Sequence, residues 1–297
     1  MDFEPRDFNE GRDVDQQSIY GFSRAEDERE RHEREARDPD PRDAFVRSVD
    51  LPRGLERELV QDSRERLYEL NGDESRTLAT IGTFRVVSER DLDTFRGAGE
   101  SLGHLRDEEL IRLVPIGHDE EAVVLTDRGW DVLDAHRRDR DDTERQEFHA
   151  GVSRPRELRH DAQLFGAYRE VEKRLHEKGA RVERVVLEVD LKREYQQFLQ
   201  EHNRHRPDSD GRPDRDEREI ESWARDHCLP YFDDQVHFPD FRIEYELDGQ
   251  DHHQDVEVVT DNYRGAHAAS RVCAGFTCVG SSKRGGAPFS PREWDWL

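Results

Sequence analysis

The sequence predicts an α/β protein of the α+β type, in which a helix-rich N-terminal domain ends in a hairpin and a second domain is built on a mixed sheet. Two observations predict this fold class. Between residues 73 and 138, three helical patterns precede two short apolar strands, and after residue 158 a helix, a strand and a two-stranded hairpin follow one another. The length of 297 residues leaves room for about two domains.

The composition excludes several classes of protein. Charged residues make up 40% of the chain and hydrophobic residues 32%, so part of the chain is expected to lie outside any hydrophobic core. No apolar run approaches the roughly 20 residues of a membrane helix, and the N-terminus lacks a signal-peptide pattern, so we expect a soluble, cytoplasmic protein without a membrane partner. The 3 cysteines form no CxxC pair and predict neither a disulfide framework nor a zinc site.

The charge balance does not favour a general polyanion binder. The chain holds 71 acidic and 47 basic residues, a formal net charge of −24, and only 4 of the basic residues are lysines. A salt-rich cytoplasm would favour such an acidic surplus, because a high net charge keeps a protein soluble. A nucleic-acid site on this chain must therefore be a local basic patch.

The first 72 residues are predicted to contain a tail and a helix. Residues 1–43 have almost no apolar periodicity, and the run from Arg24 to Asp43 alternates acidic and basic side chains without an apolar face, so we expect a disordered, charged tail. Residues 44–72 are expected to form a helical lead-in that ends at Asn71-Gly72. The apolar residues at helical spacing in this lead-in are Leu55, Leu59, Leu67 and Leu70.

Residues 73–138 are expected to form a winged helix-turn-helix. Three helices precede two strands, 111–116 and 122–125, which a polar tip joins, and a closing helix follows them. The turn after the second strand, Leu125-Thr126-Asp127-Arg128-Gly129, resembles the Leu-Thr-x-x-Gly turn of winged-helix domains in bacterial regulators. This resemblance implies that the third helix, from Ser101 to Leu110, enters the major groove of DNA.

The third helix offers few contacts with DNA. His104, Arg106 and Arg112 are the candidate contacts with bases or phosphates. The acidic run Asp107-Glu108-Glu109 and the wing tip Asp119-Glu120-Glu121 would repel phosphates. Two interpretations stay open: a domain that binds duplex DNA, and a structural, dimerising or protein-binding domain.

The second domain is expected at residues 158–280, after a charged linker at residues 139–157. Its first helix begins with His160 and Asp161. These two residues either cap the helix or contribute to a functional site.

A hairpin in the second domain is predicted to bring two acids together. Alternating apolar residues from Phe241 to Leu247 predict a strand, and a turn at Asp248-Gly249 returns the chain as its antiparallel partner. Asp240 and Glu257 are then expected side by side at one edge, where two carboxylates can share a divalent cation that polarises a phosphate and activates water. The competing interpretation is two acids on an exposed hairpin edge without a metal.

The short motifs of this hairpin are similar to those of restriction-endonuclease-like folds. Pro239-Asp240 matches the Pro-Asp step, and Glu257 with Val258 matches the start of the Asp/Glu-x-Lys strand. The order of elements, a winged helix, a helix-initial His160 and this hairpin, resembles the replication-relaxation family of plasmids and integrated mobile elements. The resemblance covers about residues 73 to 280.

The resemblance implies a site but not its activity. It assigns catalytic roles to Asp240, Glu257, Asp255 and His160 if the site is active, with Mg²⁺ or Mn²⁺ bound by Asp240 and Glu257. A nuclease needs a basic residue two positions after the second acid to stabilise negative charge, and Val259 stands there. A nuclease-like domain that does not cut DNA is therefore expected, unless another cation replaces the missing one. The candidates for that replacement are Arg264 and Lys192.

The end of the chain is more basic than the rest. Residues 262–297 carry five basic and two acidic residues, and the turn-rich segment 280–286 could wrap a phosphate. Residues 281–297 are otherwise expected to be a C-terminal tail. The candidate phosphate contacts in this region are Arg264, Lys283 and Arg284.

The leading hypothesis is a non-catalytic DNA-binding accessory or regulatory protein of a mobile genetic element, acting in plasmid replication or conjugative transfer. That biology is implied by the family resemblance. One alternative is a divalent-metal-dependent DNA nuclease of the PD-(D/E)xK type. Another is a scaffold that binds a relaxase or a replication initiator.

Overall fold

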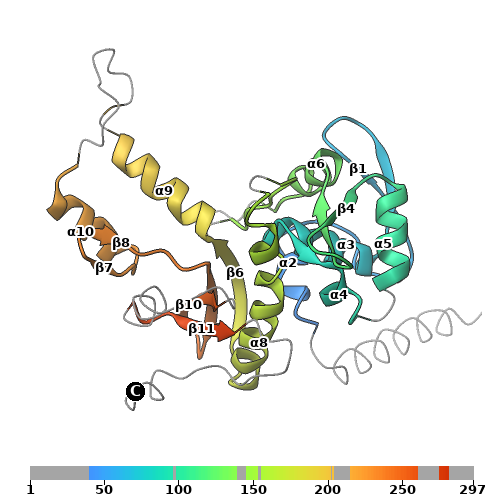
Figure 1. Ribbon diagram of the computed structural model, residues 1–297. Coiled ribbons are helices and arrows are strands. Elements are labelled where there is room, and N and C mark those ends of the chain that lie inside the picture. The colour runs from blue at the N-terminus through green and yellow to red at the C-terminus, as the bar shows by residue number, and fades with distance from the viewer. Residues whose placement is uncertain are drawn as a thin grey trace, which may run out of the picture. The chain divides into compact units, whose positions relative to one another are not determined.

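The computed structural model describes residues 40–95, 98–138, 145–152, 155–201, 203, 215–259 and 274–280. Most of the predicted N-terminal tail (residues 1–39) and the predicted C-terminal tail lie outside the described residues. The chain has a mixed α/β architecture with several sheets (Figure 1). None of the helices in the described part of the chain is long and apolar enough to cross a membrane.

The predicted helical lead-in at residues 44–72 is wrong. Only Asp43–Val46 is helical there (α2), and β1 (Glu58–Gln61) pairs with β2 (Leu67–Leu70) as an antiparallel hairpin. The side chain of Asp62 shapes the turn, because its Oδ1 accepts hydrogen bonds from the backbone N–H groups of two residues that follow it, at 2.8 and 2.9 Å.

Burial in this hairpin alternates as in a strand that is covered on one face. Val60, Tyr68 and Leu70 are buried, whereas Leu59 and Leu67 face outward. The helical spacing of the leucines was therefore misleading, because leucines from both faces of a hairpin happened to fall at that spacing.

The rest of the N-terminal half consists of four helices around a three-stranded sheet. The sheet order is β3-β5-β4, and both pairings are antiparallel. The elements are α3 (Gly72–Phe84), β3 (Val87–Ser88), α4 (Glu89–Leu92), α5 (Ala98–Asp107), β4 (Ile111–Pro115), β5 (Glu121–Leu125) and α6 (Asp127–Ala135).

Local hydrogen bonds fix the ends of these helices. Asn71 caps α3, and it forms a reciprocal capping box with Glu74. At the start of α6 the hydroxyl of Thr126 accepts a hydrogen bond from the N–H of Gly129 at 3.2 Å. A Cβ atom on Gly129 would lie 2.1 Å from the carbonyl oxygen of Leu110, so this step of the turn requires glycine.

The C-terminal half is built on a four-stranded mixed sheet of order β11-β10-β9-β6. β10 runs parallel to β11 and antiparallel to β9, and β9 runs antiparallel to β6. The predicted turn at Asp248-Gly249 is confirmed, and both residues have positive φ, 54° and 76°. The elements are α7 (Leu158–Asp161), α8 (Leu164–Glu177), β6 (Arg181–Leu187), α9 (Glu188–Gln200), α10 (Glu217–Asp226), β7 (Tyr231–Phe232), β8 (Gln235–Val236), β9 (Phe241–Leu247), β10 (Gln250–Val259) and β11 (Thr277–Gly280).

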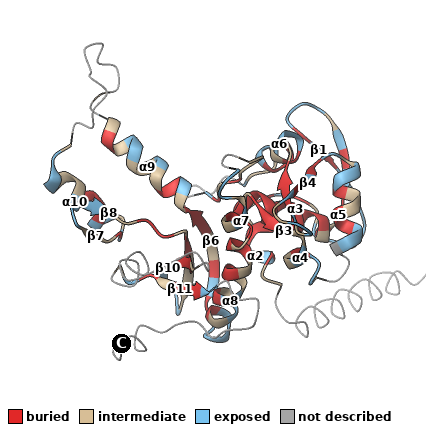
Figure 2. Ribbon diagram, viewed as in Figure 1, coloured by how far each residue is buried: buried red, intermediate tan, exposed pale blue. Residues whose placement is uncertain are grey.

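The two halves share a core. The described residues from 41 onward belong to one compact unit, and a continuous apolar cluster includes Phe84 of α3, Phe165 and Tyr168 of α8, and Phe241 of β9. Figure 2 shows buried residues along both α3 and β6. The aromatic side chains of the two halves are therefore in direct contact.

The predicted linker at residues 139–157 is partly built into the fold. Residues 139–144 and 153–154 lie outside the described part, but Gln146 is buried, and its side-chain amide bonds both the N–H and the C=O of Val185 in β6, at 3.0 and 2.9 Å. Phe148 is also buried, and its carbonyl accepts a hydrogen bond from Trp130 Nε1 at 2.9 Å. This stretch covers the free edge of β6.

Candidate functional site

The candidate site lies where β9 begins. The β9–β10 ladder ends with Phe241 opposite Val256, so Asp240 and Glu257 occupy the next step on neighbouring strands, as the hairpin pattern predicts. Asp240 Oδ2 accepts a hydrogen bond from the backbone N–H of Val258 at 2.7 Å. The carboxylate of Asp240 thus takes the place of a backbone partner at the end of the ladder.

A histidine from α7 binds the same oxygen atom. His160 Nε2 lies 3.2 Å from Asp240 Oδ2, and its Nδ1 lies 3.7 Å from Asp161 Oδ1. Burial alone would lower the pKa of His160, but the hydrogen bonds and negative charges of Asp161 and Asp240 outweigh it and raise the pKa to about 10. At neutral pH the ring is therefore an imidazolium ion that neutralises Asp240.

The second acid of α7 connects this site to the N-terminal half. Asp161 is buried and forms an ion pair with Arg85, the residue that ends α3 with a positive φ of 65°. Burial would raise the pKa of Asp161, but His160 and Arg85 outweigh it and hold the pKa below its usual value. The capping interpretation of His160 and Asp161 is wrong, because Glu157 is the N-cap residue of α7.

The other two predicted acids, Glu257 and Asp255, are largely shielded from solvent. Glu257 is 0% exposed, so the interpretation as two acids on an exposed hairpin edge is wrong for this residue. Asp255 forms two hydrogen bonds with Arg242, at 2.7 and 2.9 Å. Arg242 also donates to the backbone carbonyl groups of His227 and Cys228, just after α10, so this residue joins the end of α10 to the sheet.

These residues do not fit a hydrated Mg²⁺ or Mn²⁺ ion. Such ions need open carboxylate oxygens and keep several water ligands, whereas Asp240 Oδ2 is bound by an imidazolium and an N–H group, and Glu257 is inaccessible to solvent. In the described part of the chain, no group of three or more His, Cys, Asp or Glu side chains is arranged to hold a metal. Of the two substitute cations, Lys192 pairs with Glu188 at 2.6 Å, and Arg264 lies outside the described residues.

The candidate DNA contacts of the N-terminal half differ in their surroundings. Arg106 and Arg112 are exposed. His104 instead turns toward Glu74, which is buried, with 2.9 Å between Nδ1 and Oε1. The tip of the β4–β5 hairpin is held by α7, because Arg159 Nε donates to the carbonyl oxygen of Ile116 at 3.0 Å. Lys283 and Arg284 lie outside the described residues.

The sequence singled out the acids and the histidine but missed their basic partners. Arg85 and Arg242 belong to no motif, and arginine is abundant throughout this chain. The alternation of β9 does place Arg242 on the same face as Asp240, and antiparallel pairing puts Asp255 directly opposite it. That register was the one sequence signal that could have identified this pair.

Comparison of the chain with protein-family models, curated proteins and solved structures finds no match.

Proposed function

We propose that this protein is a non-catalytic DNA-binding accessory or regulatory protein, in which a nuclease-like carboxylate centre has become a structural ion-pair cluster. The observation that carries this proposal is the His160 imidazolium on Asp240 Oδ2. It stands where a metal-dependent nuclease would need a free carboxylate oxygen, and Val259 stands where such an enzyme would need a cation.

The DNA-binding part of the proposal is supported by the topology of the N-terminal half. The three helices and the antiparallel sheet of order β3-β5-β4 are compatible with a winged helix, in which α5 would take the position of the recognition helix. The exposed Arg106 on α5 and Arg112 on β4 supply positive charge beside that helix. Exposed Glu100 and Asp107 on the same helix limit the affinity, because they repel phosphates.

The nuclease-like part is supported by the mixed sheet, with the Pro-Asp step at the start of β9 and the Glu-Val step in β10. In the context of the replication-relaxation resemblance, we propose that the protein acts with a relaxase or a replication initiator on a plasmid or an integrated mobile element.

A salt titration tests DNA binding. We expect labelled duplex DNA to bind at low salt, measured by fluorescence anisotropy, with an affinity that falls steeply as salt is added. Replacing both arginines (R106E with R112E) should reduce the slope of log affinity against log salt by about 2. R225E on α10 is the matched control, because the Arg225 side chain is 70% exposed on a different element. No binding at low salt, or equal binding by R106E/R112E, would contradict the proposal.

A cleavage assay separates this proposal from the nuclease alternative. The protein should leave supercoiled plasmid intact after long incubation with Mg²⁺ or Mn²⁺. Cleavage that requires the metal and disappears in D240A would overturn the non-catalytic proposal while leaving DNA binding in place.

A further inference from the structure

Most of the exposed large hydrophobic residues in the described part of the chain lie on the β1–β2 hairpin or just before it. The large hydrophobic residues that are exposed in this part of the molecule are Leu55 (92%), Leu59 (70%), Leu67 (61%) and Val189 (38%). The first three lie on the hairpin or just before it. Scattered single apolar residues are normal on a protein surface, whereas two on one hairpin with a third just before it point to an interaction site.

The strand register places two of these leucines on one face. Leu59 lies opposite Glu69, and Leu67 lies opposite Gln61, so the two leucines are diagonal neighbours on the outer face of the hairpin. The other face already contributes to the core through Val60. The outer leucines are therefore not needed for folding.

The hairpin surface is acidic, because the arginines of the hairpin form ion pairs with acidic residues of α3 and α6. Arg57 pairs with Glu74 at 2.7 Å, and Arg64 and Arg66 pair with Asp131 at 3.1 and 3.0 Å. The hairpin also carries exposed acids for which the described residues show no ion pair. These acids are Glu56, Glu58, Glu65 and Glu69.

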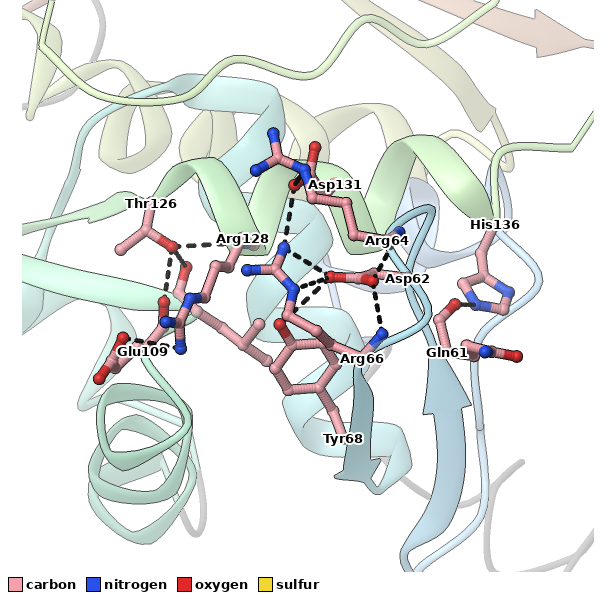
Figure 3. A network of polar contacts seen from close by, with 12 residues as sticks. Gln61, Asp62, Arg64, Arg66, Tyr68, Glu109, Thr126, Arg128, Asp131 and His136 are labelled. Atoms are coloured by element: carbon pink, nitrogen blue, oxygen red, sulfur yellow. Dashed lines mark hydrogen bonds and ion pairs between the residues drawn. The ribbon is translucent and has the colours of Figure 1, made fainter.

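A polar network holds the hairpin in a fixed position on α6 (Figure 3). Arg66 bridges Asp62, at 2.6 Å, and Asp131 of α6. On the other strand, His136 Nε2 lies 2.8 Å from the carbonyl oxygen of Gln61. A surface that is already ordered loses little conformational entropy when a partner binds.

We propose that the hairpin surface, formed by Leu59, Leu67, Glu65 and Glu69, binds a basic amphipathic segment of another protein. Leucines require apolar side chains from the partner, and the acids around them require lysine or arginine. DNA fits this surface poorly because the acids repel phosphates. A second copy of the chain fits poorly because a symmetric contact would bring the same acids together. This interaction goes beyond the proposed DNA binding and uses other residues.

A designed peptide probe tests the proposal with the full-length protein. The probe is a short fluorescein-labelled peptide of leucine and lysine, patterned as an amphipathic helix. One control peptide replaces lysine by glutamate, and the other replaces leucine by serine. We expect the protein to bind the leucine–lysine peptide in anisotropy measurements and neither control peptide. L59S/L67S should weaken that binding by about tenfold or more, and E65K/E69K should weaken it as well.

Matched variants separate this surface from the general acidity of the chain. V189S removes an exposed apolar residue that lies away from the hairpin, on α9, and E177K removes an acid on α8, so both should bind the probe as the unaltered protein does. Equal binding by L59S/L67S and the unaltered protein would overturn the proposal. A dimer in light scattering that L59S/L67S converts to a monomer would overturn it in favour of self-association, and loss of DNA affinity in L59S/L67S would assign the surface to DNA.

Discussion

Replacing His160 by glutamine tests the electrostatic interpretation of the candidate site. Glutamine retains an N–H donor for Asp240 but carries no charge, so the variant removes the cation and keeps the size and polarity of the side chain. The expected result is a loss of stability that depends on pH. The DNA binding that we propose for Arg106 and Arg112 should not change, because those residues are not part of this cluster.

The magnitude follows from the pKa of His160. At about 1.4 kcal/mol for each unit of pKa, the rise from 6.5 to about 10 sets an upper limit of about 5 kcal/mol. The side chain is 29% exposed, so solvent screening lowers the expected contribution to about 2–4 kcal/mol. Because the folded state binds this proton more tightly than the unfolded state, the contribution is complete below about pH 6.5 and is lost as the pH rises through about 10.

The assay is urea unfolding followed by tryptophan fluorescence at several pH values between 6.5 and 10 and at constant salt. The unaltered protein should lose unfolding free energy as the pH rises, and H160Q should be less stable at pH 6.5 and lose much less over the same range. H176Q is the control, because His176 is exposed on α8. Parallel pH profiles for H160Q and the unaltered protein would refute the assignment of an imidazolium to this site.

Three further substitutions test other parts of the structure. Arg242→Met should lower the unfolding free energy by about 3–5 kcal/mol, because it leaves Asp255 buried without its charge partner. A second change, Asp255→Leu, should recover most of this loss of stability. If the double variant is no more stable than Arg242→Met, the explanation is wrong. Asp62→Ala should lower the unfolding free energy by about 1–3 kcal/mol and speed amide hydrogen exchange in β1 and β2. Unchanged exchange would show that the turn does not need this carboxylate. Gly129→Ala should lower the unfolding free energy by about 1–3 kcal/mol through the clash with the Leu110 carbonyl oxygen, and an unchanged melting temperature would contradict that contact.

The sequence predicts best those elements for which the spacing of apolar residues and the residues of the turn indicate the same structure. The hairpin of β9 and β10 is confirmed because strict alternation and an Asp-Gly turn indicate the same structure. The lead-in failed because leucines at helical spacing outweighed Asp62, whose side chain favours a turn. Spacing alone could not separate these alternatives.

The sequence also predicts only part of the candidate site. Neighbouring positions for Asp240 and Glu257 follow from counting residues along the hairpin, but the burial of Glu257 depends on β11, which pairs beside it. The ion pair between Arg85 and Asp161 joins residues that are 76 positions apart in the chain. Such contacts depend on how the two halves pack against each other, and local sequence patterns do not predict that packing.

The single turn of α7 also limits how this protein can vary in length. Three consecutive residues bind three different elements: Arg159 reaches the β4–β5 tip, His160 reaches the start of β9, and Asp161 reaches the end of α3. Each helical residue is rotated by about 100° from its neighbour, so inserting or deleting one residue within this turn would point all three side chains in wrong directions at once. Homologous chains that keep these contacts should therefore tolerate gaps on either side of α7 but none inside it.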